Sequence, residues 1–190
     1  MKHLSIAAAL IMSAGAAFAA PEKYELDASH SQVMFTYEHL GFSTTYNMFS
    51  GFTGDIMVDQ KDVQNSSVSV TIPTRSLFTG WEARFEHFMG DDFFGAAEDE
   101  MITFTSTAIE VTGDNTANIT GDLTVNEVTK PVVLAATLNN SGQNPMSGKE
   151  WAGFDATATI MRSDFNLGAF APAVSDEIEV FISIEAGKAE

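Results

Sequence analysis

The stretch ITGDLTV, residues 119–125, alternates apolar or small residues with polar ones. Ile119, Leu123 and Val125 share one phase of this alternation, while two threonines and an aspartate occupy the other. Because successive side chains of a β-strand point to opposite faces, the pattern predicts a strand with one buried and one solvent-facing side. Such strands are typical of antiparallel sheets, which commonly cover a core on one face only.

The same alternation returns along the rest of the chain and indicates the fold class. It is found at residues 33–38, 49–59, 67–72, 102–106, 154–160 and 178–185. With residues 119–125 and the apolar run 132–138, these segments number about eight, which predicts an all-β sandwich or a closed up-and-down barrel. A barrel of about eight strands leaves no open edge and can hold one small ligand.

Several segments are expected to depart from simple alternation. Gly51 and Gly54 suggest bends or bulges within the strand predicted over residues 49–59. The run 132–138 is apolar on both faces, which predicts cover on both sides. The polar sequence NNSGQNPMSG, residues 139–148, predicts a long loop.

Residues 79–94, TGWEARFEHFMGDDFF, form the one stretch without β-like alternation. Thr79 and Glu82 have the spacing of a capping box, and Gly90 suits the end of a short helix. The apolar face of this helix would carry Trp81, Phe85, Phe88 and Met89. Such a helix either covers a packed core or forms a lid or plug on a cavity for a large apolar ligand, and both interpretations stay open.

The N-terminus has the three parts of a secretory signal peptide, predicted over residues 1–19. Lys2 and His3 form a basic start, residues 4–12 form an apolar run, and the sequence Ala-Phe-Ala ends the segment. The apolar run is too short to span a bilayer. We therefore expect Sec-type export to the periplasm, and a mature chain of residues 20–190 that forms a single β-barrel domain.

The expected mature chain is strongly acidic and contains no cysteine. Removal of the leader leaves eight basic residues against 26 acidic ones, a formal charge of −18. This charge disfavours nucleic acid and anionic membrane surfaces, because binding to both depends on lysine and arginine. We expect no nucleic-acid partner, no membrane-spanning segment and no disulfide, although the compartment is oxidising.

Phenylalanine and methionine point to a possible ligand cavity. Phe42, Phe49 and Phe52 lie close to Tyr46 in the sequence, and further rings crowd residues 78–94. Methionine adds a flexible, polarizable surface that suits an irregular apolar partner. Ligand pockets are mostly apolar with a few placed polar groups. Phenylalanine and methionine are also ordinary core residues, so a ligand cavity and a packed core both remain open.

Chemistry based on histidine has little support in the sequence. His30, His39 and His87 lack the close spacing of a zinc motif. His30 precedes Ser31, but adjacent strand residues point to opposite faces, and no G-x-S-x-G elbow is present. We therefore expect these histidines to be structural, holding loops to the barrel by hydrogen bonds, and we expect no metal and no cofactor.

Five motifs occur in a fixed order along the chain and together resemble the YceI-like family of exported polyisoprenoid-binding proteins. They are YELDASHSQVMFTYEHLGFST, FSGFTG, SLFTGWEARFEHFMGDDFF, GDLTVNEVTKPVVL and RSDFNLG. The resemblance covers residues 24–186, which is nearly the whole expected mature chain.

The resemblance implies an extended lipocalin-like antiparallel barrel around a long hydrophobic cavity. It further implies a non-enzymatic carrier or sequestering protein that binds a long isoprenoid lipid, either an isoprenoid quinone or a polyprenyl chain, through mostly nonpolar contacts. The side chains expected to contact this lipid are Phe35, Phe42, Phe49, Trp81, Phe85, Phe88, Met89 and Phe104.

The head group of the lipid is a separate question. Arg75 and Arg84 flank the start of the expected helix and are the candidates to bind it. Tyr46 stands where the family commonly has a basic residue, and Phe85 stands where it commonly has aspartate. Because the negative charge of the chain would repel a diphosphate, we expect a neutral head such as a quinone ring.

One further departure and two alternatives complete the expectations. Asn47 replaces a usual glycine, and asparagine tolerates the left-handed conformation that glycine would supply. A hydrolase or metalloenzyme that combines the histidines with Asp91 or Asp92 is one alternative function. The other is a stress-related exported protein whose cavity is incidental.

Overall fold

The computed structural model describes residues 20–190, and the expected signal peptide at residues 1–19 lies outside these described residues. The described part contains α1 (Glu82–Met89) and the short 3-10 turns η1 (Ala28–His30), η2 (Val63–Asn65), η3 (Thr74–Ser76) and η4 (Arg162–Phe165). Its strands are β1 (Glu22–Leu26), β2 (Gln32–His39), β3 (Ser43–Phe49), β4 (Thr53–Val58), β5 (Ser67–Pro73), β6 (Met101–Gly113), β7 (Thr116–Val125), β8 (Val128–Gln143), β9 (Glu150–Met161) and β10 (Glu177–Lys188).

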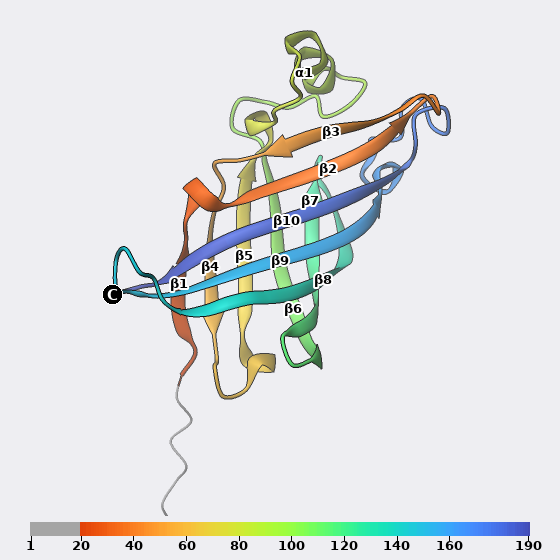
Figure 1. The fold of residues 1–190 in the computed structure, drawn as a ribbon. Coiled ribbons are helices and arrows are strands. Elements are labelled where there is room, and N and C mark those ends of the chain that lie inside the picture. Colours follow the sequence, from red (N-terminus) through yellow and green to blue (C-terminus); the bar gives the residue numbers. More distant parts are fainter. Residues whose placement is uncertain (1–19) are drawn as a thin grey trace, which may run out of the picture.

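The strands form one antiparallel sheet that closes into a barrel. The strand order runs β1-β4-β5-β6-β7-β8-β9-β10, and β10 also pairs with β1, which completes a ring of eight strands. β2 pairs with another part of β10 and carries β3 on its other edge. This arrangement, seen in Figure 1, confirms the predicted all-β, lipocalin-like barrel of about eight strands with one short helix.

The period-2 pattern sorts the barrel wall into an inner and an outer face. Ile119, Leu123 and Val125 of β7 face the interior, as their shared phase predicts, and Asp122 is exposed. Gly121 has the inward phase and lies beneath the Phe104 ring of β6. Since glycine has no side chain, the ring can cover the β7 backbone at this position.

Two separate segments pair with β10 along the same edge. β1 ends opposite Ala186, and β2 begins opposite Ser183. Between them, η1 turns away and leaves Glu185 without a strand partner on this edge. The Glu185 amide donates to Ser31 Oγ at 3.3 Å, and its carbonyl oxygen accepts from the Asp27 amide at 2.8 Å. The hydrogen bonds lost from the sheet are therefore replaced locally.

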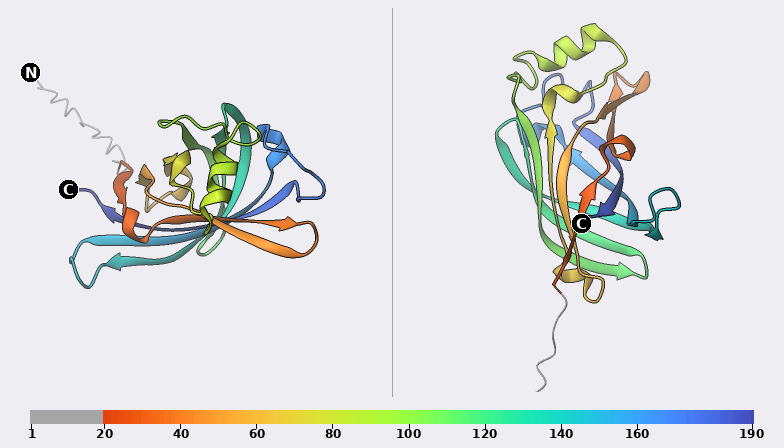
Figure 2. Two further views of the ribbon diagram at one scale, coloured as in Figure 1. Left: turned by 90° about the horizontal axis from the view of Figure 1, so that it is seen from above. Right: turned by 90° about the vertical axis from the view of Figure 1, so that its left-hand side faces the viewer.

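The barrel wall is discontinuous at the end that carries α1. β3 pairs with β2 on one side, and in the described residues its other edge meets the chain only at a bridge between Met48 and Phe78. Figure 1 and Figure 2 show α1, the β2–β3 turn and the segment before β10 at this same end. We call this end of the barrel the mouth.

Two of the strand predictions need correction. The strand predicted over residues 49–59 is broken, because β3 ends at Phe49 and the chain turns at Gly51, whose φ is +66°. The loop predicted over residues 139–148 is shorter than expected, because β8 continues to Gln143. Extended backbone on both sides of these turns is stabilised by pairing with neighbouring strands, which local composition does not reveal.

The prediction that residues 132–138 are covered on both faces is wrong. Leu134 faces the barrel interior, whereas Val133 is 52 % exposed on the outer side. No second layer covers this part of β8 in the described residues. Valine and alanine suit a strand even on an exposed face, so an apolar run does not by itself require cover on both sides.

The helix does not begin with the predicted capping box. Trp81 is the N-cap residue of α1, and in the part of the chain that the structure describes the helix start has no side-chain cap hydrogen bond. Thr79 instead stabilises its own turn, since its Oγ1 donates to the Trp81 carbonyl oxygen at 2.8 Å. The helix does end before Gly90, as predicted. None of the described helices has the length and apolar character needed to cross a membrane.

Asn47 does not adopt the left-handed conformation that its replacement of glycine suggested. It lies within β3 and is 2 % exposed, and its side-chain amide has no hydrogen-bond partner among residues 20–190. Strand pairing with β2 therefore sets its backbone, and the polar side chain is buried at a cost of roughly 1–3 kcal/mol.

We expect Gly121→Ala to lower the free energy of unfolding by roughly 1–3 kcal/mol, because the new methyl group would overlap the packed barrel wall. The added Cβ would meet the Phe104 ring and lie 2.6 Å from the Thr105 carbonyl oxygen. Gly153→Ala in β9 is the matched control, since the nearest atom to its Cβ would be 4.0 Å away. Urea unfolding measures both variants, and equal stabilities would contradict the packing argument.

Candidate functional site

An elongated cavity of about 1530 Å³ occupies the inside of the barrel. Its wall extends from α1 at the mouth to the β6–β7 turn at the opposite end. Between these ends the wall is apolar and consists largely of the inward-facing residues Val33, Val70, Ile72, Ile102, Ile119, Leu123, Leu134, Ile160, Ile178 and Ile182. The interior is therefore a cavity rather than a filled core, which favours the ligand-cavity interpretation of the sequence.

Polar lining residues are concentrated at the two ends of the cavity. At the mouth they are His39, Ser43, Thr45, Arg84 and His87. At the opposite end they include Gln60, Ser66, Asp114, Asn115 and Glu150. An apolar middle between two polar ends suits a long molecule that is hydrophobic over most of its length.

Five rings at the mouth form what we call the mouth aromatic cluster: Tyr37, His87, Phe88, Phe93 and Phe170. All five line the cavity. Phe93 lies 5.2 Å from Phe88, 6.1 Å from Phe170 and 5.0 Å from His87 between ring centroids, and Phe88 lies 6.1 Å from Tyr37. These distances are typical of favourable aromatic pairs. The cluster therefore joins α1 to β2 and to the loop before β10.

Five of the eight side chains expected to contact lipid line the cavity. They are Phe35, Phe49, Trp81, Phe88 and Phe104. Phe35 and Phe49 stack across β2 and β3 with ring centroids 5.6 Å apart. All five side chains therefore lie on the wall of one cavity. Their contact with a lipid stays a prediction.

The other three side chains expected to contact lipid, Phe42, Phe85 and Met89, do not line the cavity. Phe42 lies in the turn after β2 and is 88 % exposed. Met89 is buried in the hydrophobic core cluster, and Phe85 packs against that cluster without lining the cavity. On α1, His87 and Phe88 line the cavity instead. The residues of the apolar face predicted from the sequence are therefore divided between the cavity and the core.

Most cavity residues were absent from the sequence-based expectations, and three of them show what signal was available. Tyr37 shares the inward phase of Phe35 in β2, so the alternation already contained the signal for it. Phe170 lies in a loop with a φ of +65°, where no periodic pattern applies. Arg162 belongs to the RSDFNLG motif, but nothing in that motif indicates that its side chain faces the cavity.

Arg162 is 8 % exposed and organises the loop between η4 and β10. Its guanidinium donates to four backbone carbonyl oxygens, those of Leu167, Ala169, Val174 and Ser175. Burial lowers the pKa of Arg162, while nearby Asp176 acts in the opposite direction. Because these carbonyls occupy most of its donors, Arg162 holds the Phe170 loop in place rather than presenting a free cation to the cavity.

The two arginines proposed for the head group do not form a pair at the cavity. Arg84 lines the mouth, donates to the Thr79 carbonyl oxygen at 2.9 Å and lies 6.0 Å from the Trp81 ring centroid. Arg75 is not part of the cavity wall, and its Nη1 donates to the Ala96 carbonyl oxygen at 3.2 Å. Only Arg84 of the two is placed to meet a ligand at the mouth.

The three histidines occupy different places. His39, at the end of β2, and His87, on α1, both line the mouth. His30 lies in η1, with its Nδ1 2.8 Å from Asp27 Oδ2. Among the described residues, His30 is the one histidine with side-chain hydrogen bonds, and its partners Ser29 and Asp27 lie in or next to the same 3-10 turn, so these bonds do not tie a loop to the barrel.

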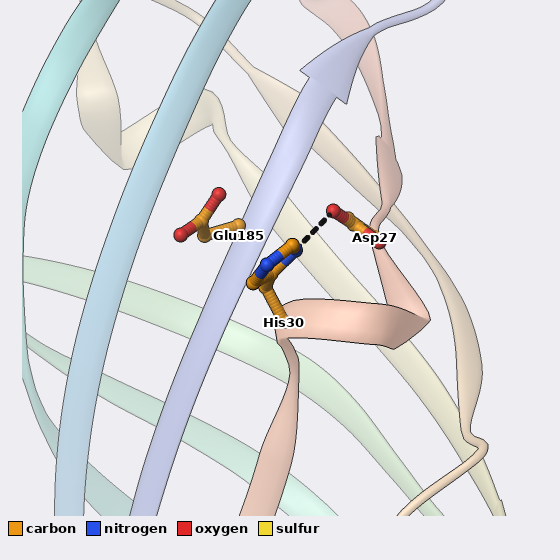
Figure 3. Close-up of side chains that lie close together, drawn as sticks. All are labelled: Asp27, His30 and Glu185. Atoms are coloured by element: carbon orange, nitrogen blue, oxygen red, sulfur yellow. Dashed lines mark hydrogen bonds and ion pairs between the residues drawn. The ribbon is translucent and has the colours of Figure 1, made fainter.

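Asp27, His30 and Glu185 bring possible metal-ligand atoms within 4.8 Å of one another, as Figure 3 shows. These groups already have partners, since Glu185 Oε2 accepts from Trp151 Nε1 at 2.8 Å. Hydrogen bonds from Ser29 and His30 lower the pKa of Asp27 to about 2, and the bond to Asp27 raises the pKa of His30. A metal would therefore compete with a proton on His30 and with existing hydrogen bonds.

Asp27, Ser29 and His30 lie together but do not have the geometry of a Ser-His-Asp triad. Ser29 Oγ and Asp27 Oδ2 both approach the same nitrogen of His30, Nδ1, at 3.0 and 2.8 Å. A Ser-His-Asp triad instead places its serine and its carboxylate on opposite ring nitrogens. His87 packs against Phe93, and the carboxylates that follow α1 are exposed.

An antiparallel barrel around an apolar cavity with polar ends defines the class of lipocalin-like binding proteins for elongated hydrophobic ligands. The chain belongs to the YceI-like family, because the model of the YceI-like domain matches residues 24–186. This confirms the resemblance found in the sequence motifs.

Known relatives cover nearly all of the chain. Protein YceI of Escherichia coli is 41% identical over 178 residues, which are 94% of this chain and 92% of the relative. The crystal structure of BcnA from Burkholderia cenocepacia has a TM-score of 0.76 at 26% identity and covers 84% of this chain and 98% of that one. The YceI protein of Campylobacter jejuni has a TM-score of 0.73 at 31% identity, with 80% and 90% covered.

Phe88→Ala should weaken retention of a prenyl lipid more than it lowers stability, because this ring lines the cavity. Phe85→Ala, one turn away on the same helix, should do the reverse and cost about 2 kcal/mol of unfolding free energy, since that ring packs against the core without lining the cavity, whereas Phe88 also lines the cavity. Lipid occupancy by mass spectrometry and melting temperature are measured for both. Unchanged occupancy in Phe88→Ala, with only a lower melting temperature, would show that this ring is core.

We expect dialysed protein to contain less than one zinc per chain, because His30 is already bonded to Asp27 and no group of three or more possible metal ligands among the described residues contains two of the histidines. Metal analysis of the purified protein and of His30→Ala measures this. His87→Ala, if folded, should still bind lipid. A tightly held zinc that is lost on substituting any of the three histidines would contradict the structural role proposed for them.

Proposed function

We propose that the protein is an exported, non-enzymatic carrier or sequestering protein that holds a long isoprenoid lipid in its barrel. The observation that carries this proposal is the cavity of about 1530 Å³, which is apolar along its middle and polar only at its ends. The signal-peptide pattern of residues 1–19 supports a periplasmic location.

The relatives support an isoprenoid rather than another apolar ligand. One solved structure with this fold is described as a polyisoprenoid binding domain from Saccharophagus degradans implicated in plant cell wall breakdown. It has a TM-score of 0.68 at 15% identity and covers 87% of this chain, so the likeness concerns the fold. Membership of the YceI-like family, together with the length of the cavity, makes an isoprenoid chain the ligand class that we propose.

Apolar burial alone is sufficient to hold such a chain. Each buried CH₂ contributes roughly 0.8 kcal/mol, so several prenyl units give useful affinity without a strong polar anchor. Ordering of the flexible tail offsets part of this binding free energy, at roughly 0.5–1.5 kcal/mol for each immobilised flexible group. Long tails therefore bind better than short ones until the cavity is filled.

The mouth favours a neutral head group over a diphosphate. Arg84 is the cation at the mouth surface, because Arg75 lies outside the cavity wall and Arg162 is bound to backbone carbonyls. His39, Ser43 and His87 add polar groups suited to one or two hydrogen bonds. A quinone ring with carbonyl acceptors and an aromatic body fits this set.

Extraction of the purified protein with organic solvent, followed by mass spectrometry, tests the proposed function. We expect a stoichiometric isoprenoid lipid in the extract. Absence of any stoichiometric lipid would favour a protein whose cavity is incidental, and bound zinc together with hydrolytic turnover would favour an enzyme.

An isoprenoid quinone should outcompete a prenyl diphosphate of equal tail length, because carboxylates near the mouth repel a diphosphate. Competition at two salt concentrations measures this preference. The contrary result is tighter diphosphate binding that weakens steeply with salt and is lost in Arg84→Ala. Arg75→Ala is the matched control, since Arg75 lies outside the cavity wall.

A further inference from the structure

Six large apolar side chains at the mouth are exposed to solvent. They are Leu40 (50 %), Phe42 (88 %), Tyr46 (63 %), Phe78 (64 %), Trp81 (64 %) and Phe170 (58 %). We call this set the apolar rim. Three of its members, Leu40, Trp81 and Phe170, also line the cavity, so the rim is continuous with the cavity wall.

Backbone contacts hold the rim segments next to one another. The Leu40 amide donates to the Ala173 carbonyl oxygen at 2.9 Å, which joins the β2–β3 turn to the Phe170 loop. The Phe170 ring lies 6.2 Å from the His87 ring of α1. On the other side, Phe78 is bridged to β3, the strand that carries Tyr46. Figure 1 shows these segments at one end of the barrel.

The rim differs from the rest of the surface in its chemistry. Among the described residues, the other exposed large apolar side chains, apart from Phe181, are not aromatic: Val63, Met101, Val111, Val133, Met146 and Met161. Val63 and Val111 of this set also line the cavity, at its opposite end. Five of the six rim residues are aromatic, and among them are one tryptophan, Trp81, and one tyrosine, Tyr46. These residue types prefer the interface between water and a lipid bilayer, because each has a large apolar body and a polar or polarizable edge.

The charges beside the rim indicate which lipid surface fits. Glu38, Glu82, Glu86, Asp91 and Asp92 are exposed at this end of the molecule. Arg84 is the basic side chain among them that reaches the mouth, whereas Arg162 is buried. Such a surface is repelled by anionic lipid and tolerated by zwitterionic lipid.

We propose that the apolar rim docks the protein, mouth first, on a zwitterionic lipid bilayer, from which the cavity loads and into which it releases its ligand. This inference rests on the proposed function, since a lipid ligand needs a path that avoids water. Docking by rings at the interface brings the cavity opening to the acyl chains, and the carboxylates beside the rim keep the attachment reversible.

Co-sedimentation with phosphatidylcholine vesicles tests the proposal. The double variant Phe42→Ser with Phe78→Ser removes two rim rings that do not line the cavity. We expect its vesicle partition to fall about tenfold or more, because each lost ring removes apolar area from the bilayer interface. Addition of phosphatidylglycerol to the vesicles should weaken binding of the unmodified protein.

The matched control is Met146→Ser with Phe181→Ser, which removes two exposed apolar side chains outside the rim. It should bind vesicles as the unmodified protein does. Both double variants should still bind a short prenol in vesicle-free solution, where docking is not needed. Vesicle binding without prenol binding by the unmodified protein would overturn the proposed lipid ligand and leave the docking surface supported.

Three results would overturn the docking proposal while the lipid ligand stands. One is prenol binding without any vesicle binding by the unmodified protein. Another is equal vesicle binding by the rim variant and the control. The last is a dimer in sedimentation velocity that the rim variant abolishes, which would show that a second copy of the chain covers the rim.

Discussion

The whole architecture depends on the way β10 shares one edge between two partners. β1 closes the barrel along the end of β10, and β2 pairs with an earlier part of the same strand. The backbone between them must still be satisfied, because unpaired buried amides are costly. Ser31 and Asp27 supply the missing partners to Glu185, so the strand can divide without losing hydrogen bonds. The pairing with β1 closes the barrel along one part of β10. The pairing with β2 places β2 and β3 at the mouth, where the cavity entrance lies.

The mouth itself is held by tertiary contacts rather than by regular secondary structure. A helix of eight residues such as α1 is marginal alone, because helix nucleation costs more than a few hydrogen bonds return. The mouth aromatic cluster attaches it to β2 and to the Phe170 loop. Arg162 holds that loop from inside by donating to four carbonyl oxygens. The cavity entrance is therefore set by a few long side chains that bridge segments far apart in the sequence.

The candidate site was only partly predictable for the same reason. Phe35 and Phe104 lie on strands, where a shared phase already indicates which face a residue occupies, and both line the cavity. Phe85 and Phe88 lie on one helix, where the apolar pattern does not say which stripe faces the cavity and which faces the core. Phe170 lies in a loop, where no period exists to indicate its direction. Sequence spacing identifies the elements, whereas the packing of one element against another assigns the residues.

The sequence by itself determined the all-β class, the inward phase of the strands with clear alternation, the presence of one short helix and the family. These follow from local sterics, since alternation along a strand needs no knowledge of its partners, and from motifs that keep their order along the chain. The tertiary structure decided which side chains line the cavity, that α1 stands at its mouth, and that no other segment within residues 20–190 covers the outer face of β8. It also decided that Asp27, His30 and Glu185 meet. These features depend on barrel closure and on contacts between residues as distant in the sequence as Asp27 and Glu185. The barrel closes only when its first and last strands pair, and a local sequence pattern does not encode that pairing.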